Sequence, residues 1–279
     1  MNLIRRSIAA AALGVLIAGQ PACAQPVAAP DATAKPNFAP QVGQAGKDVV
    51  WVPTNQALVD RMLDMARLTP RDHLVDLGSG DGRMVITAAK RGATARGIEF
   101  NPDLVGLAQR TAAAEGVGSR ARFEQADIFQ SDFRNATVVT LFLLPDLNLR
   151  LRPTLLAMKP GTRVVSNSFT MGDWQPDESA QVTEGCASYC IAHKWVVPAQ
   201  VAGSWRIGNQ QLSLKQEFQM LSGSLQNGAS TLPITDGRMD GGQIRFTAGG
   251  RRYVGAVSGS SIRGTTDGAA AWTAARQPG

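Results

Sequence analysis

The stretch that decides the fold is residues 75–83, which read Val-Asp-Leu-Gly-Ser-Gly-Asp-Gly-Arg. A short apolar segment at residues 73–77 predicts a β-strand, and residues 83–90 predict a helix. The three alternating glycines between them allow a tight turn and a close approach of a ligand to the backbone. The Asp-x-Gly-x-Gly-x-Gly spacing differs from the Gly-x-Gly-x-x-Gly pattern of dinucleotide-binding folds. The stretch therefore predicts either a ligand-binding turn of another class or a tight turn without a ligand.

Carboxylates follow two further predicted strands. Glu99 ends the strand at residues 95–99, and Asp127 follows the strand at residues 122–125. A carboxylate at the end of a strand can accept two hydrogen bonds from the hydroxyls of a ribose. Taken alone, Glu99 could equally be a solvated strand end, and Asp127 an ordinary turn residue. Their order and spacing after the glycine turn favour a nucleoside site.

Strand and helix patterns alternate from residue 48 to about residue 198, which predicts an α/β domain with a largely parallel sheet. A helix capped by Thr54 precedes the first strand. Seven strands are expected in a Rossmann-like arrangement. Beyond the first three strands, the predicted segments are strands at 138–144 and 163–168, a helix at 147–158, and a terminal hairpin at 181–182 and 187–197.

The period of the pattern changes to two after Pro198, and helical patterns cease. Short alternating segments are separated by turns such as Asp236-Gly237 and Gly249-Gly250. Residues 199–279 therefore predict a small antiparallel all-β domain, a sandwich or partial barrel. This domain contains no constellation of catalytic type.

The first 24 residues read as an export signal that ends near Ala24. Arg5-Arg6 leaves the twin-arginine and general export routes both open. The apolar run at residues 8–18 is too short to span a membrane, so the mature chain is expected to be periplasmic or secreted, without an integral membrane span. Residues 25–47 are rich in proline and alanine and predict a flexible linker.

Removal of the signal takes away two arginines, which leaves 26 basic and 22 acidic residues and a formal charge of +4. No cluster of basic and aromatic residues accompanies this charge, so no nucleic-acid partner is expected. Cys186 and Cys190 remain as a close pair, which in an oxidising compartment favours a disulfide. A metal site that includes His193 is the alternative, but no fourth ligand is evident, and no metal is expected.

The glycine motif, followed by Glu99 and Asp127, resembles the signature of class I S-adenosylmethionine (SAM) methyltransferases. The resemblance implies SAM as cofactor, with the ribose on Glu99 and the adenine between Asp127 and an apolar face. The residues that it marks as cofactor-binding are Asp76, Gly78, Ser79, Gly80, Gly82, Glu99, Phe100, Asp127 and Ile128.

Further stretches of residues 48–197 are similar to the FAM173-type protein-lysine methyltransferases, which are distant relatives of Dot1 histone-lysine enzymes. They are Val50-Trp51-Val52-Pro53-Thr54, residues 74–83, residues 97–102 and Trp174-Gln175-Pro176. In that family the segment matching residues 51–54 folds over SAM, although this chain has Trp51 where tyrosine is usual. The resemblance implies that Trp51, Pro53, Thr54, Leu144 and Pro145 line the substrate channel.

The sequence thus predicts a SAM-dependent methyltransferase that acts on a protein lysine or on a small molecule. Leu143-Leu144-Pro145 stands where amide- and adenine-methylating enzymes carry a polar motif, which disfavours those two acceptors. The alternative of another class is an exported binding protein that keeps the fold without catalysis. An NAD-dependent oxidoreductase is disfavoured by the glycine spacing. The catalytic residues and the oligomeric state are not determined by the sequence.

Overall fold

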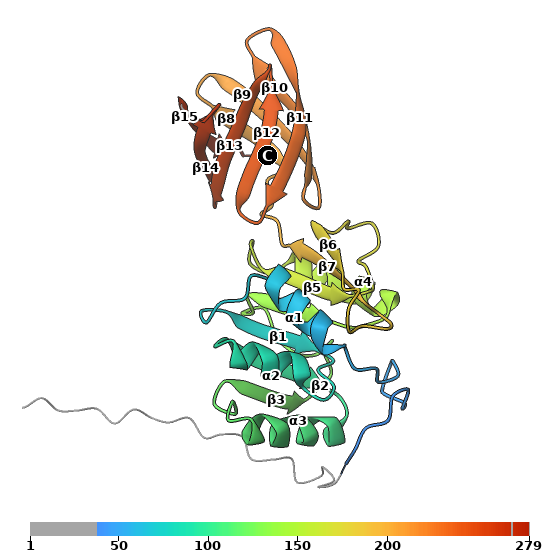
Figure 1. The fold of residues 1–279 in the computed structure, drawn as a ribbon. Helices are drawn as coiled ribbons and strands as arrows, with labels where there is room; N and C mark the ends of the chain where they lie inside the picture. The colour runs from blue at the N-terminus through green and yellow to red at the C-terminus, as the bar shows by residue number, and fades with distance from the viewer. Residues whose placement is uncertain (1–37, 269, 279) are drawn as a thin grey trace, which may run out of the picture.

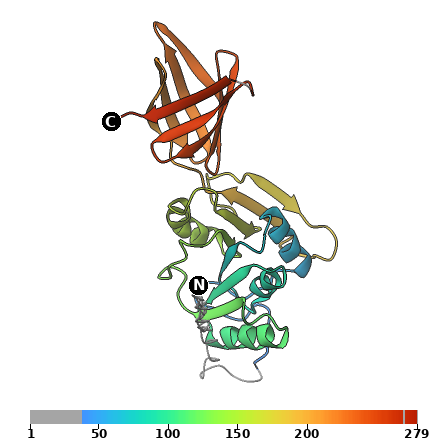
Figure 2. The ribbon, with the colours of Figure 1, turned by 90° about the vertical axis from the view of Figure 1, so that its left-hand side faces the viewer.

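The computed structural model describes residues 38–268 and 270–278, and the predicted export signal lies outside them. An α/β domain is followed by a β-barrel, which stands at the β6 end of the α/β domain, far from α3 (Figure 1). The view turned by 90° shows that the two bodies meet over a narrow junction (Figure 2). No helix in the described part of the chain has the length and apolar character needed to cross a membrane.

The α/β domain is built on a sheet of seven strands in the order β3-β2-β1-β4-β5-β7-β6. Strands β1 to β5 are parallel to one another, and β7 is antiparallel to both β5 and β6. The Rossmann-like seven-stranded sheet predicted from the sequence is confirmed. The strands are β1 (His73–Leu77), β2 (Thr94–Glu99), β3 (Ala121–Gln125), β4 (Val138–Leu141), β5 (Arg163–Asn167), β6 (Glu178–Gln181) and β7 (Ile191–Val196).

Helices cover both faces of this sheet and give it two cores. The helices α1 (Gln56–Met65), α2 (Arg83–Lys90) and α3 (Pro102–Ala114) pack their apolar sides on one face. The helix α4 (Pro145–Leu156) packs on the other face together with Trp174 and Trp195. The strands are therefore buried on both sides, as their near-continuous apolar sequences require.

Three local predictions in this domain were wrong. The terminal hairpin, expected at residues 181–182 and 187–197, is formed by Glu178–Gln181 and Ile191–Val196, and the two cysteines lie in the loop between these strands. The N-cap of α1 is Asn55, whose side chain accepts a hydrogen bond from the Ala57 N–H, and not Thr54. Asparagine caps at least as well as threonine, which leaves the Thr54 hydroxyl free for another contact described below. Strand β4 ends at Leu141, three residues earlier than predicted, because Pro145 begins α4 and the residues between them form the connection.

The C-terminal domain is a closed barrel of eight antiparallel strands, in which β15 returns to pair with β8. Alternate side chains fill its interior, among them Trp205, Phe246, Tyr253 and Trp272. The small antiparallel all-β domain is confirmed, as a complete rather than a partial barrel. Its strands are β8 (Gly203–Ile207), β9 (Gln210–Glu217), β10 (Met220–Asn227), β11 (Ser230–Asp240), β12 (Gln243–Ala248), β13 (Arg251–Ser258), β14 (Ser261–Thr266) and β15 (Ala270–Arg276).

The turn predicted at Asp236-Gly237 was wrong. Both residues lie inside the long strand β11, where the pairing with β12 shifts register between Thr235 and Arg238. Asp236 has φ of 52°, and a residue of this conformation is typical of a bulge as well as of a turn. The bulge bends β11 so that the sheet can close.

One hairpin of the barrel anchors it to the α/β domain. The ring of Phe218, in the turn between β9 and β10, stacks on Trp174 with centroids 6.1 Å apart and 17° between the planes. Nearby, Arg238 donates a hydrogen bond of 2.5 Å to the carboxylate of Asp177. The junction therefore combines an aromatic contact with a partly buried ion pair.

Candidate functional site

A pocket opens at the edge of the sheet where the parallel strands end. The residues that follow β1, β2 and β3 contribute the glycine turn, Glu99 to Asn101, and Asp127. Carboxyl ends of parallel strands at a change of strand order are the usual ligand sites of open α/β sheets. Here the order changes at β1, which lies between β2 and β4.

The glycine turn is held in a conformation that other residues rarely adopt. Gly78, Gly80 and Gly82 have φ of 79°, 54° and 83°. A Cβ on Gly80 would lie 2.7 Å from the indole nitrogen of Trp51, so this glycine makes room for the tryptophan. A Cβ on Gly82 would lie 2.7 Å from the Phe123 ring. The motif therefore serves both the shape of the pocket and the packing behind it.

Glu99 braces the glycine turn from the end of β2. One oxygen of its carboxylate accepts a hydrogen bond of 2.9 Å from the backbone N–H of Gly80. The other oxygen accepts a bond of the same length from Asn101 N–H. Each carboxylate oxygen can accept more than one hydrogen bond, so Glu99 keeps acceptor capacity for a ligand.

Asp127 is engaged on both oxygens. One accepts a hydrogen bond of 2.9 Å from the Phe129 N–H, and the other lies 2.7 Å from the ammonium of Lys47. The same ammonium lies 5.0 Å from the centroid of the half-exposed Phe100 ring. The hydrogen bond to Lys47 and that to Phe129 hold the pKa of Asp127 below its usual value. A ligand that uses this carboxylate must share it with Lys47.

Residues 44–54 form a strap along one side of the pocket. Thr54 fixes the end of the strap, because its carbonyl accepts a hydrogen bond of 2.8 Å from Arg83 and its hydroxyl accepts one of 3.2 Å from Asn167. Asp81 orients the Arg83 guanidinium through hydrogen bonds to both of its oxygens. Residues 44–47, which the sequence assigns to the linker, are thus part of the pocket wall.

Asp76 is buried at the floor of the pocket. Burial raises the pKa of its carboxyl to about 7, although a hydrogen bond of 2.6 Å from the Thr140 hydroxyl favours the charged form. The negative charges of Glu99 and Asp81 add to the increase in pKa. The three carboxylates make the glycine side of the pocket suited to a cation.

The raised pKa of Asp76 predicts a pH-dependent stability. The folded protein keeps this proton up to about pH 7, whereas the unfolded chain loses it near pH 3.8. The stabilisation is therefore complete below pH 3.8 and is lost as the pH rises through 7. We expect the ligand-free protein to lose stability from pH 5 to pH 8 relative to the Asp76→Asn variant. Urea unfolding of both proteins at the two pH values measures this difference, and an equal loss in both would contradict it.

Most of the residues predicted from the sequence line this one pocket. Gly82 and Pro145 do not, because Gly82 begins α2 against Phe123 and Pro145 lies in the first turn of α4. Those that do are Trp51, Pro53, Thr54, Asp76, Gly78, Ser79, Gly80, Glu99, Phe100, Asp127, Ile128 and Leu144. Sequence reasoning missed Lys47, Asp81, Arg83, Phe142, Phe169 and Tyr189.

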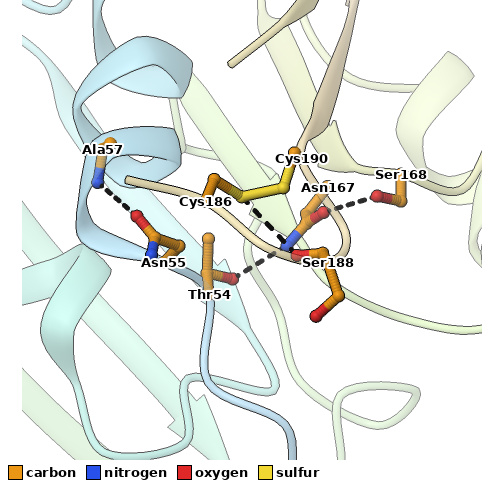
Figure 3. Close-up of a disulfide and its surroundings, with 8 residues drawn as sticks. All are labelled: Thr54, Asn55, Ala57, Asn167, Ser168, Cys186, Ser188 and Cys190. Carbon is orange, nitrogen blue, oxygen red and sulfur yellow. Dashed lines mark hydrogen bonds between the residues drawn. A yellow bond between two sulfur atoms is a disulfide. The ribbon is translucent and has the colours of Figure 1, made fainter. Parts of the chain in front are cut away.

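The two cysteines lie beside the pocket. A disulfide joins Cys186 to Cys190 in the loop before β7, close to Thr54 and Asn167 (Figure 3). His193, the third residue of the alternative metal set, faces the hydroxyl of Ser179 at 2.8 Å. Within the residues that the structure describes, no group of three or more His, Cys, Asp or Glu side chains is arranged to hold a metal ion.

Comparison with known proteins identifies the domain around this pocket. Residues 76–178 match the family model of the ANTKMT methyltransferase domain. A protein-lysine N-methyltransferase of Saccharolobus islandicus is 40% identical over 146 residues, which are 51% of this chain and 91% of that protein. The adenine nucleotide translocase lysine N-methyltransferase of Mus musculus is 38% identical over 130 residues, which are 46% of this chain and only 56% of the mouse protein.

A solved structure gives the same result for the fold. An RNA methyltransferase from Salinibacter ruber, in complex with S-adenosylhomocysteine, is 46% identical. The match covers 54% of this chain and 96% of the other, with a TM-score of 0.51. These matches stop short of the whole chain, and the chain spans little more than half of the mouse relative.

The residues present fit the cofactor that the comparisons imply. Gly78 and Gly80 keep the backbone of the turn in the pocket wall free of side chains, and Glu99 keeps acceptor capacity for hydroxyl donors. Buried and partly buried carboxylates on the same side suit a ligand that carries a sulfonium and an ammonium. The geometry of the pocket and the likeness to these relatives agree. The chain therefore belongs to the family of SAM-dependent methyltransferases that share the ANTKMT methyltransferase domain.

Proposed function

We propose that this methyltransferase modifies lysine side chains of another protein. Two of the relatives described above are named for lysine methylation, and the family model matches residues 76–178, which contribute much of the pocket lining. The observation that carries the proposal is the apolar character of the pocket beyond β4. Leu143 and Leu144 line it there, and no planar amide would find a polar anchor on them.

The chain's own residues would hold the reactants and lower the barrier by position and environment. SAM supplies the activated methyl group: its carbon–sulfur bond breaks with the electron pair left on sulfur, while the lone pair of the acceptor nitrogen forms the new bond to carbon. Glu99 and Asp127 would hold the nucleoside of the bound cofactor, and the glycine turn would hold its other end. Apolar residues around the acceptor disfavour its ammonium form and so lower the pKa of the amine. A dedicated general base is not required.

We further propose that the protein acts after export, in the periplasm or outside the cell. The segment that carries this proposal, residues 1–24, lies outside the described residues. The Cys186–Cys190 disulfide supports it, because such bonds persist in oxidising compartments.

One labelling experiment tests both the reaction and its acceptor. The protein without residues 1–24 is incubated with SAM carrying a radioactive methyl group and with separate cytosolic, membrane and exported fractions of the source cells. We expect label in protein, recovered as methyl-lysine by mass spectrometry, and strongest with the membrane or exported fraction. Label in small molecules would favour the small-molecule alternative. Binding of SAM without transfer to any fraction would favour the non-catalytic alternative.

A further inference from the structure

Three aromatic rings come from different elements to one side of the pocket. Phe142 follows β4, Phe169 follows β5, and Tyr189 precedes β7. Because β7 is antiparallel to β5, its beginning lies at the edge of the sheet where β4 and β5 end. Topology alone therefore brings the three residues together.

The rings form a continuous surface, which we call the aromatic wall. The Phe142 and Tyr189 rings meet edge to face with centroids 5.2 Å apart. The Phe169 ring lies 6.0 Å from Tyr189 and 6.2 Å from Phe142. Tyr189 is 46% exposed, so its ring still faces the open pocket and solvent.

The disulfide holds Tyr189 in this position. Tyr189 lies within the five-residue loop closed by Cys186 and Cys190, and its φ of 55° is in the left-handed region. A non-glycine residue adopts that conformation at a cost and persists in it only when the surroundings impose it. The loop also lies against the start of α1, with Thr54 and Asn167 beneath it (Figure 3). The short loop closed by the disulfide restricts the backbone and can impose this left-handed conformation on Tyr189.

The aromatic wall lies at the half of the sheet that contributes none of Asp76, Glu99 and Asp127 to the pocket. Asp76, Glu99 and Asp127 lie at the ends of β1, β2 and β3, while the rings lie at β4, β5 and β7. Trp51, which the sequence resemblance assigns to the substrate channel, packs on Gly80 on the cofactor side. The acceptor side of the pocket is thus aromatic and apolar, and the cofactor side is acidic.

We propose that the aromatic wall is the subsite for an alkylamine acceptor and for the ammonium that it becomes on methylation, and that the Cys186–Cys190 bridge positions Tyr189 within it. The inference rests on the proposed lysine acceptor. During transfer, positive charge passes from the sulfur to the acceptor nitrogen, and the methylated nitrogen later releases a proton to water. Ring faces attract such a charge, so the wall favours the transition state over the neutral amine.

Binding of a shape-matched pair of probes tests the wall without turnover. One probe is Nα-acetyl-Nε-trimethyl-lysine methylamide, and the other replaces the trimethylammonium by a tert-butyl group. Both are titrated by NMR into the protein saturated with S-adenosylhomocysteine. We expect the wild-type protein to bind the cation about 2- to 30-fold more tightly than its neutral analogue.

Variants then assign the preference to the wall. Tyr189→Phe should keep it, whereas Tyr189→Ala should lose most of it. The paired replacement Cys186→Ser with Cys190→Ser should also lose most of it, while the protein stays folded by circular dichroism and its affinity for S-adenosylhomocysteine stays near that of the wild type. An undiminished preference in Tyr189→Ala, or none in the wild type, overturns the wall. An undiminished preference in the serine pair overturns the role of the bridge.

The outcome is separable from that of the labelling experiment. If the preference for the cationic probe depends on Tyr189 but no fraction yields methyl-lysine, the alkylammonium subsite is supported and a protein acceptor is rejected. If methyl-lysine is formed but the preference for the cationic probe does not depend on Tyr189, the lysine acceptor is supported and the role of the aromatic wall is rejected.

Discussion

Replacement of Glu99 by alanine is expected to weaken the binding of S-adenosylhomocysteine by at least about a hundredfold. Hydrogen bonds to a charged group contribute about 1.5–3 kcal/mol each, and two of them from the ribose hydroxyls would account for this loss. The variant also removes the brace on the Gly80 N–H, so the glycine turn becomes less well ordered for binding. Isothermal titration calorimetry measures the change in affinity.

A neighbouring glutamate supplies the control for this prediction. Glu124 lies on β3, is partly exposed, and forms a 3.8 Å ion pair with Arg96. Glu124→Ala should leave the affinity within about twofold, because exposed pairs of this kind contribute little. Similar affinities for Glu99→Ala and Glu124→Ala, with both proteins folded by circular dichroism, would show that Glu99 does not hold the ribose.

Replacement of Trp174 by alanine is expected to lower the free energy of unfolding by about 3–5 kcal/mol, the usual cost of truncating a buried aromatic residue. Its side chain is fully buried between Trp195 and Phe218, with ring centroids 6.0 Å and 6.1 Å away. The loss should affect the α/β domain and the docking of the barrel together. Urea unfolding followed by circular dichroism, which does not depend on tryptophan emission, measures the change.

The indole nitrogen of Trp174 provides a sharper comparison. Among the described residues it has no hydrogen-bond partner, whereas the nitrogen of Trp195 donates a bond of 2.7 Å to the Trp174 carbonyl. Trp174→Phe should therefore cost clearly less than Trp195→Phe, which also leaves a buried carbonyl unpaired. Equal costs, or a loss below about 1 kcal/mol for Trp174→Ala, would contradict this account of the core.

The sequence was sufficient for the cofactor side of the pocket because its determinants are local. The glycine turn and Glu99 each follow a strand directly, and parallel strands bring their carboxyl ends to one edge. Alternation of side chains likewise revealed the all-β domain. Its closure was not predictable, because the pairing of β15 with β8 joins segments about seventy residues apart, and alternation says nothing about which strands meet.

The aromatic wall was not predicted, for the same physical reason. Phe142 fell within an overlong predicted strand, and Phe169 carried no local signal. Tyr189 lies just before β7, which runs antiparallel to β5, in a loop that a disulfide closes. Lys47 sat in a proline-rich segment that gave no indication of an ordered strap. Contacts between distant segments decide these positions.

Closure of the barrel also limits how it could recognise other molecules. Its described strands close into a ring in which β15 pairs with β8 at Ala274–Arg276, so little backbone edge is left for a partner that would add a strand of its own. Side chains such as Trp205 and Phe246 pack in its interior. The barrel therefore offers a partner mainly its outward side chains and its hairpin tips, and the tip at Phe218 is already committed to Trp174.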